Sequence, residues 1–322
     1  MNLDITVHKG EKDRPVVILI HGLSMDKNFW LDPLNTKMFA RNVPLSVFTA
    51  KKPSPRKSIK GRKITLGEFP CNVENMWSLL QGAGYGLVCW SQRRPVGPIL
   101  SAVEELAWIV KMTKEKFRGR PIVLIGHSRG GLIARKYMET KDPEIKALIT
   151  ISTPHAGSSI AKIGNYLEPF SAILRKISPE SDHTVISRTV KNVKNLLEGK
   201  AWKDLMPGSV FFKNLNDTCL KGVYYVSFGG TQPRFFTLYF WKKKGDKIYA
   251  HPLLSIPDSL VKAVPPVLKI EEIMPGGGDG LVTLKSSEMP WSSDHYNVSA
   301  NHVSVIWNKK TIDAVFRTLN SI

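Results

Sequence analysis

Cysteine is scarce in this sequence. Three cysteines, Cys71, Cys89 and Cys219, occur in a chain of 322 residues. They are too few and too scattered for a disulfide framework or for a zinc site built from cysteine. We expect them to serve in packing, with a single disulfide as the alternative if the protein is exported.

Long apolar runs are also missing. No stretch approaches the roughly 20 apolar residues that cross a membrane as a helix. Residues 1–8 lack the basic start and the apolar segment of a signal peptide. The sequence as written therefore predicts a cytoplasmic protein, although a secreted mature form from which a leader had been removed would read the same way.

Acidic residues are outnumbered by basic ones. The chain has 27 Asp and Glu against 46 Lys and Arg, a formal net charge of +19. The basic residues concentrate at 51–63, 175–176, 188–203 and 242–244. No nucleic-acid-binding motif accompanies them, so no nucleic-acid partner is predicted. We favour solvated faces as their role, and after that an anionic membrane or lipid interface.

What the chain does contain is an alternation of apolar strands with amphipathic helices. With 42% hydrophobic residues, it can form a large core. Strands are predicted at 16–20, 86–90, 122–125, 147–151 and 223–228, and helices at 75–81, 99–117, 132–138 and 310–319. This order predicts an α/β fold with a mostly parallel, doubly wound sheet. Residues 64–66 suggest a short hairpin, and residues 235–241 either a partly exposed hairpin or a buried strand.

The alternation stops after Gly157. Up to about residue 207 only helical patterns occur, mainly at 160–177 and 183–197. We interpret residues 158–206 as a helical cap inserted into a core formed by residues 1–157 and 207–322. The apolar faces of the cap either pack against the sheet or line a pocket for an acyl chain.

One turn dominates the candidate chemistry. Gly126-His-Ser-Arg-Gly130 joins a predicted strand to a predicted helix. This G-x-S-x-G spacing holds its serine in a strained turn and lifts the hydroxyl clear of the sheet, so Ser128 is the candidate nucleophile. The alternative is a glycine-rich connection in which the serine is incidental.

A second loop fits the same chemistry. The strand at 16–20 ends at His21-Gly22-Leu23, at the edge where an open α/β sheet builds its site. A serine nucleophile needs backbone N–H groups to hold the developing oxyanion. We predict these donors to be Leu23 and Arg129, with His21 and His127 fixing the geometry of the two turns.

A serine hydroxyl also needs a histidine base and a carboxylate that orients it. Asp279, in Gly276-Gly-Gly-Asp-Gly280, is the candidate acid, expected on a loop after a late strand, although Asp-Gly is also common in plain turns. His302 is the candidate base and His295 its competitor. The order serine, acid, histidine is that of α/β-hydrolases.

Together these segments resemble the bacterial lipases and carboxylesterases of the α/β-hydrolase superfamily, including clostridial-type true lipases. The resemblance runs from about residue 14 to the C-terminus. It is carried by His21-Gly22, Gly126-His-Ser-Arg-Gly130, Ser152-Thr-Pro-His-Ala-Gly157, Asp204-Leu-Met-Pro-Gly-Ser209, Phe228-Gly-Gly-Thr231, Gly278-Asp-Gly-Leu-Val282 and Asn301-His302.

The resemblance implies an α/β-hydrolase fold and hydrolysis of acylglycerols or simpler acyl esters. It implies Ser128, Asp279 and His302 as the triad, and the cap as a lid. Two departures concern metals. Residues 24–126 hold no histidine, which removes the zinc site of some relatives, and Ser304 stands where others have an aspartate that binds calcium. No metal and no cofactor are therefore expected. Arg129 replaces the methionine or glutamine of many lipases and is expected to place a cation beside the pocket.

Two other classes of function stay open from the sequence. An acyltransferase or a thioesterase would use the same three residues. A non-catalytic protein of this fold that binds a lipid, a membrane or another partner would keep the fold without turnover. The oligomeric state is left open by the sequence.

Overall fold

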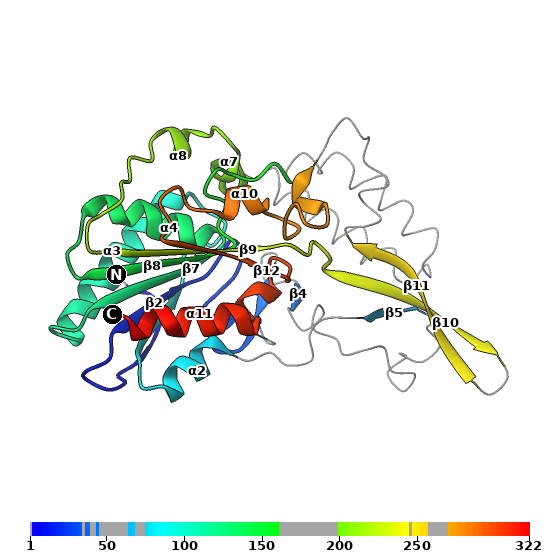
Figure 1. Ribbon diagram of the computed structural model, residues 1–322, viewed down its shortest axis with the longest axis horizontal. Helices are drawn as coiled ribbons and strands as arrows, with labels where there is room; N and C mark the ends of the chain where they lie inside the picture. Colours follow the sequence, from blue (N-terminus) through cyan, green and yellow to red (C-terminus); the bar gives the residue numbers. More distant parts are fainter. Residues whose placement is uncertain are drawn as a thin grey trace.

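The computed structural model describes residues 2–33, 36–38, 43–44, 64–67, 75–160, 199–244, 247–256 and 270–322. Its body is a sheet of seven strands in the order β1-β6-β2-β7-β8-β9-β12, with helices on both faces (Figure 1). Only β1 runs antiparallel to its neighbour. The strands are β1 (Asp4–His8), β2 (Val16–Ile20), β6 (Gly86–Ser91), β7 (Ile122–His127), β8 (Ile145–Ile151), β9 (Tyr224–Gly230) and β12 (Asp294–Val298).

The two faces of the sheet are covered by different helices. Successive side chains of a strand point to opposite faces, so the five buried residues of β2 divide between two hydrophobic clusters. One cluster includes Val16 and residues of α3 (Ile99–Lys116) and α4 (Arg129–Tyr137). The other includes Val17 and residues of α1 (Asn28–Leu31), α2 (Met76–Gly82) and α11 (Lys309–Asn320). This double covering explains why the central strands are continuous apolar runs.

The carboxyl ends of three central strands meet at one edge. Ile20 of β2 pairs with Gly126 of β7, and His127 pairs with Ile151 of β8. The loops that follow these strands therefore begin side by side. This register brings the His21-Gly22-Leu23 loop next to the turn that carries Ser128.

A second, three-stranded sheet has the order β11-β10-β5. β10 (Phe236–Lys244) and β11 (Lys247–Ile256) pair as an antiparallel hairpin, which confirms the hairpin predicted for residues 235–241, while its partial exposure stays a prediction. β5 (Ile64–Gly67) pairs antiparallel with β10, and the residues on either side of it, which the predicted hairpin would include, lie outside the described residues. A short pair, β3 (Lys37–Met38) and β4 (Val43–Pro44), lies apart from both sheets.

The predicted α/β-hydrolase fold is confirmed. Two edge strands were missed: β1 is half exposed, and β12, Asp-His-Tyr-Asn-Val, is mostly polar, so neither carries a strong apolar pattern. The predicted helices at 160–177 and 183–197 lie outside the described residues, and the cap stays a prediction. After that gap come α7 (Lys200–Leu205) and α8 (Val210–Lys213).

The cysteines only partly follow expectation. Cys89 is buried on β6, and burial raises the pKa of its thiol to about 12. Cys219 is exposed, so the prediction that it serves in packing was wrong. Both thiols are free, and Cys71 lies outside the described residues. Among the helices of the described residues, none has both the length and the apolar character to cross a bilayer.

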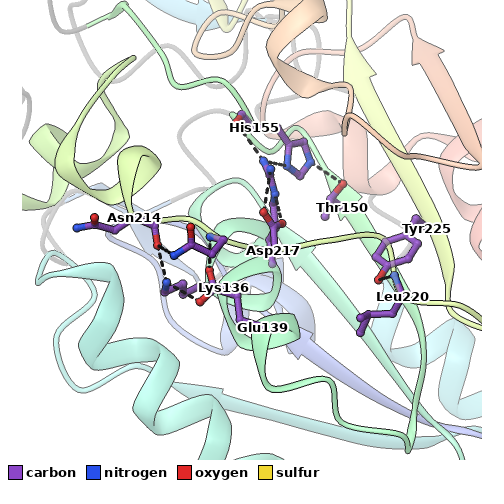
Figure 2. Close-up of polar contacts among 10 residues, drawn as sticks. Lys136, Glu139, Thr150, His155, Asn214, Asp217, Leu220 and Tyr225 are labelled. Atoms are coloured by element: carbon purple, nitrogen blue, oxygen red, sulfur yellow. Dashed lines mark hydrogen bonds and ion pairs between the residues drawn. The ribbon is translucent and has the colours of Figure 1, made fainter.

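A buried ion pair joins α4 to the chain before β9. Arg135 binds Asp217 through two nitrogens, with Nη2 3.2 Å from Oδ1, and both side chains are almost fully buried (Figure 2). Arg135 also donates from Nη1 to the carbonyl oxygen of His155 at 3.1 Å and stacks over Trp291. His155 in turn contacts the hydroxyl of Thr150 on β8. The cluster therefore ties the helix that follows Ser128 to the loop after β8.

Removing one partner of this pair should be costly. Asp217→Ala leaves the Arg135 cation buried without its carboxylate, so we expect the free energy of unfolding to fall by about 3 kcal/mol or more. The measurement is urea unfolding at pH 7. Asp313→Ala provides the control, because its partner Lys309 is 87% exposed. That substitution should cost less than about 1 kcal/mol. Equal losses in the two variants would contradict this role for the cluster.

Candidate active site

Ser128 occupies a strained turn between β7 and α4. Its backbone has φ 54° and ψ −126°, a left-handed conformation that is rare for a residue other than glycine. Its N–H donates to the carbonyl oxygen of Ile151 at 2.8 Å. A Cβ added to Gly126 would lie 2.5 Å from Gly131, and one on Gly130 would collide with the carbonyl oxygen of Ile20. The turn therefore requires both glycines of the motif.

The loop after β2 packs directly on this turn. A Cβ on Gly22 would lie 3.1 Å from the Cβ of Ser128 and 3.1 Å from Nδ1 of His127. Leu23 follows, and Ser24 then adopts φ 59° while donating its N–H to the carbonyl oxygen of Pro95 at 3.0 Å. Leu23 thus belongs to a loop fixed against the serine turn, which is where its predicted N–H donor is needed.

Asp279 and His302 lie together, 23 residues apart in the chain. Nδ1 of His302 is 2.9 Å from Oδ2 of Asp279, and both side chains are buried. The main-chain N–H of His302 also donates to the carbonyl oxygen of Asp279 at 2.9 Å. A carboxylate at Nδ1 places the proton there, so Nε2 is left as the basic nitrogen of the ring.

The element before the Asp279 loop is not the strand that the sequence predicted. The loop follows a 3-10 helix, η7 (Glu271–Ile273), and not a strand of the main sheet. Asp279 still contacts the sheet, because a Cβ added to Gly230, the last residue of β9, would lie 2.7 Å from the Cβ of Asp279. Its Oδ1 accepts from the N–H groups of Leu281 and Val282 at 3.0 and 2.8 Å. These bonds leave Oδ2 directed at His302.

His127 joins the two halves of the site, and sequence reasoning missed this contact. Its Nε2 donates to the carbonyl oxygen of His302 at 2.7 Å, across 175 residues of chain. The two rings lie 4.9 Å apart between centroids. Because His127 directly precedes Ser128, this bond holds the histidine loop against the serine turn. No local pattern announces such a bond.

The side chain of Arg129 is buried, and its hydrogen bonds go to neighbouring residues of the protein. Its guanidinium binds the side-chain oxygen of Gln92 and donates to the carbonyl oxygens of Gly97 and Pro98 at 2.8 and 3.0 Å. Burial lowers the pKa of Arg129 to about 10, opposed by Asp204 and Glu105, so it remains a cation at neutral pH. The guanidinium thus fixes residues 92–98, and the expectation that it places a cation beside the pocket stays a prediction.

Gln92 carries this network to the loop after β2. Its side chain donates to the carbonyl oxygen of His21 at 2.9 Å, and its main-chain N–H donates to Nε2 of His21 at 3.1 Å. Nε2 can accept only when the ring is neutral. Accordingly, burial lowers the pKa of His21 to about 4, and Arg129 adds to this effect. Arg129, Gln92 and His21 together brace the loop that carries Leu23.

Two further buried histidines are neutral for the same reason. Burial lowers the pKa of His127 well below its usual value, and His302 adds to the effect. Burial also lowers the pKa of His155 well below its usual value, with a further contribution from Arg135. His127 directly precedes Ser128, and His155 lies in the loop after β8. Protonation of either ring would therefore disturb the loops around the candidate site.

The remaining candidates lie elsewhere. His295, the competitor of His302, is on β12 and contacts the hydroxyl of Ser227 at 2.8 Å. Within the described ranges, no three His, Cys, Asp or Glu side chains gather as a metal site would need. Asn301, which the sequence marked only as part of a motif, accepts from Val303 and Ser304 and so shapes the turn around His302.

The chain resembles known proteins in one segment of its sequence and in its fold. Residues 99–206 match the family of PGAP1-like alpha/beta domains. The mature form of the lipase BlEst2 from Bacillus licheniformis superposes with a TM-score of 0.57 at 15% identity, over 98% of this chain and 97% of that one. Its propeptide form gives 0.58 at 16% identity, over 98% and 53%.

A lipase-esterase related protein from Clostridium acetobutylicum aligns over 98% of both chains, at 11% identity and a TM-score of 0.47. No curated protein matches the sequence. The sheet order and the BlEst2 superpositions show that the chain has the α/β-hydrolase fold.

The neutral histidines predict a dependence of stability on pH. Burial lowers the pKa of His21 to about 4 and lowers the pKa values of His127 and His155 well below their usual value, whereas histidines in the unfolded chain protonate near pH 6.5. Their contribution to stability is fully present above pH 6.5 and is lost as the pH falls. For His21 we expect the free energy of unfolding to fall by about 2 kcal/mol between pH 8 and pH 5, and His127 and His155 act in the same direction. Urea unfolding across this range measures the slope.

His155→Gln removes one of the three groups. This variant should show a shallower decline between pH 7 and pH 5 than the wild type, by up to about one proton. Parallel curves for the two proteins would rule out the assignment of His155 as a neutral native group.

Proposed function

We propose that the protein is a serine carboxylic-ester hydrolase with Ser128 as nucleophile, His302 as base and Asp279 as the acid that orients it. One observation carries the proposal: the His302–Asp279 pair is held by His127 against the strained turn of Ser128. The substrate class we propose is acylglycerols or simpler acyl esters, in keeping with the lipase BlEst2, which shares the fold.

The first half of the reaction transfers the acyl group to the enzyme. Nε2 of His302 takes the proton of the Ser128 hydroxyl as its oxygen attacks the ester carbonyl. The resulting oxyanion is held by the N–H groups of Leu23 and Arg129, the latter at the start of α4 where the helix dipole favours negative charge. A donor of this kind is typically worth about 3 kcal/mol in the barrier.

The first half ends when His302 gives its proton to the leaving alcohol as the ester C–O bond breaks. In the second half His302 takes a proton from a water molecule that attacks the acyl-enzyme, and it passes this proton to the Ser128 oxygen as the carboxylic acid leaves. Asp279 stabilises the imidazolium formed in each half. The buried bracing by Arg129, Gln92 and His21 keeps the Leu23 loop in place without contributing to the chemistry directly.

An acyltransferase or a thioesterase would use the same residues. Acyl transfer to an added alcohol in preference to water would indicate the first, and faster cleavage of a thioester than of its oxygen ester the second. A non-catalytic lipid-binding or membrane-binding protein would turn over none of these substrates. These three measurements separate the alternatives.

Ser128→Ala should abolish turnover. The assay is hydrolysis of p-nitrophenyl esters of increasing chain length and of emulsified triglyceride, and we expect at least about a thousandfold loss of kcat because the nucleophile is gone. A rise in wild-type rate above the solubility limit of the substrate would indicate a lipase. Retention of activity in Ser128→Ala would refute the assignment.

Ser152→Ala is a matched control for that experiment. Ser152 is also a buried serine with a positive φ, 50°, at the end of the neighbouring strand β8. It should keep wild-type kcat. Thermal unfolding of both variants would show that neither effect comes from loss of the fold.

Asp279→Asn tests the acid. The amide keeps the shape and the acceptor for Leu281 and Val282, but it no longer holds the Nδ1 proton, so we expect kcat to fall about a thousandfold or more with little change in KM. His295→Asn is the companion variant and should retain activity. If His295→Asn lost activity while His302→Asn kept it, the choice of His302 as base would be wrong.

A further inference from the structure

The β10–β11 hairpin extends away from the body of the protein. Figure 1 shows both strands running outward from the seven-stranded sheet. Among the described residues, β5 pairs with β10 from Phe240 back to Thr237. Beyond Phe240, the part of the chain that is described continues the hairpin as a two-stranded ribbon to the pair Lys244 and Lys247.

Apolar and basic residues occupy separate sections along this ribbon. Aromatic and aliphatic residues fill Phe236-Thr-Leu-Tyr-Phe-Trp241, and three lysines follow at 242–244. The register places Lys243 opposite Ile248 and Lys242 opposite Tyr249. Residues 236–256 hold four lysines and one acidic residue, Asp246. A basic end thus lies next to an apolar, aromatic section on the same ribbon.

The hairpin begins at the loops of the candidate acid and base. A Cβ on Gly280, next to Asp279, would lie 2.5 Å from the ring of Phe235. The side chain of Asn301, next to His302, donates to the carbonyl oxygen of Arg234 at 2.7 Å. Residues 234 and 235 lead directly into β10, so the base of the ribbon is seated on the two loops that form the His302–Asp279 pair.

This combination fits a lipid surface with negative charge. Lysines are attracted to anionic headgroups, and aromatic side chains favour the boundary between headgroups and acyl chains. The net charge of +19 favours approach to such a surface. Single-stranded nucleic acid also binds basic and aromatic side chains, but the seating of the hairpin at the candidate ester-cleaving site favours lipid.

We propose that the β10–β11 hairpin docks the protein on anionic lipid surfaces and so presents the His302–Asp279 edge of the site to lipid-borne substrate. The second half of this statement rests on the proposed hydrolase function. The first half concerns binding alone and is tested without turnover.

The experiment compares cosedimentation with vesicles of phosphatidylcholine alone and of phosphatidylcholine mixed with phosphatidylglycerol. Wild type should bind the mixed vesicles, more weakly as salt is added, and should bind neutral vesicles poorly. The triple variant Lys242→Glu, Lys243→Glu, Lys244→Glu should lose about a hundredfold in affinity. A second variant, Trp241→Ser, should also bind the mixed vesicles more weakly, because it removes the indole from the aromatic section.

A triple variant elsewhere controls for net charge. Lys12→Glu, Lys111→Glu, Lys116→Glu changes three exposed lysines outside the hairpin and should keep wild-type vesicle binding. Both triple variants should hydrolyse a short soluble ester at the wild-type rate, which also shows that they are folded. Vesicle binding without any ester turnover would leave the docking proposal standing and defeat the proposed function.

Three results would overturn the docking proposal. The first is an equal loss of vesicle binding in the two triple variants, which would indicate net charge alone. The second is wild-type binding to neutral vesicles as strong as to mixed ones, or to neither. The third is binding of single-stranded DNA, but not of mixed vesicles, that the Lys242–Lys244 substitutions abolish.

Discussion

The close approach of backbone to backbone around Ser128 is the constraint on which the rest of the site depends. Gly126 and Gly130 allow the turn after β7 to lie against the start of α4 and against the carbonyl of Ile20. Gly22 then allows the loop after β2 to rest on Ser128 itself. Each contact leaves no room for a side chain. The serine is held in a left-handed conformation because the neighbouring backbone on every side fixes it there.

Several polar side chains around this turn have a structural role: they hold the neighbouring loops in place. Arg129, Gln92 and His21 form a buried chain of hydrogen bonds that ends on the loop of Leu23. The one N–H group of the neutral His127 ring donates to the carbonyl oxygen of His302. Nε2 of His21 accepts its hydrogen bond only while the ring is neutral, and a proton added to Nδ1 of the buried His127 ring would find no acceptor among the described residues. The frame of the site is therefore linked to pH through residues that need not touch a substrate.

The second sheet extends this frame outward. Residues 232–235 leave the end of β9 and pass the loops of Asp279 and His302, where Ala300, Asn301 and Gly280 contact them. They then enter β10, which pairs with β5 from a segment about 170 residues earlier in the chain. Two segments far apart in the sequence thus combine into one sheet, and the residues that lead into β10 contact the loops of Asp279 and His302.

The sequence alone determined the central strands, the helices that flank them, the serine turn and the order of Ser128, Asp279 and His302. Those features depend on local patterns: apolar runs, helical periodicity, and glycines at fixed spacing. Tertiary structure alone decided the burial of the Arg129 side chain, the bond from His127 to His302, the seat of Asp279 against Gly230 and the pairing of β5 with β10. These contacts join residues many positions apart, and no local pattern records which partner the folded chain will bring near.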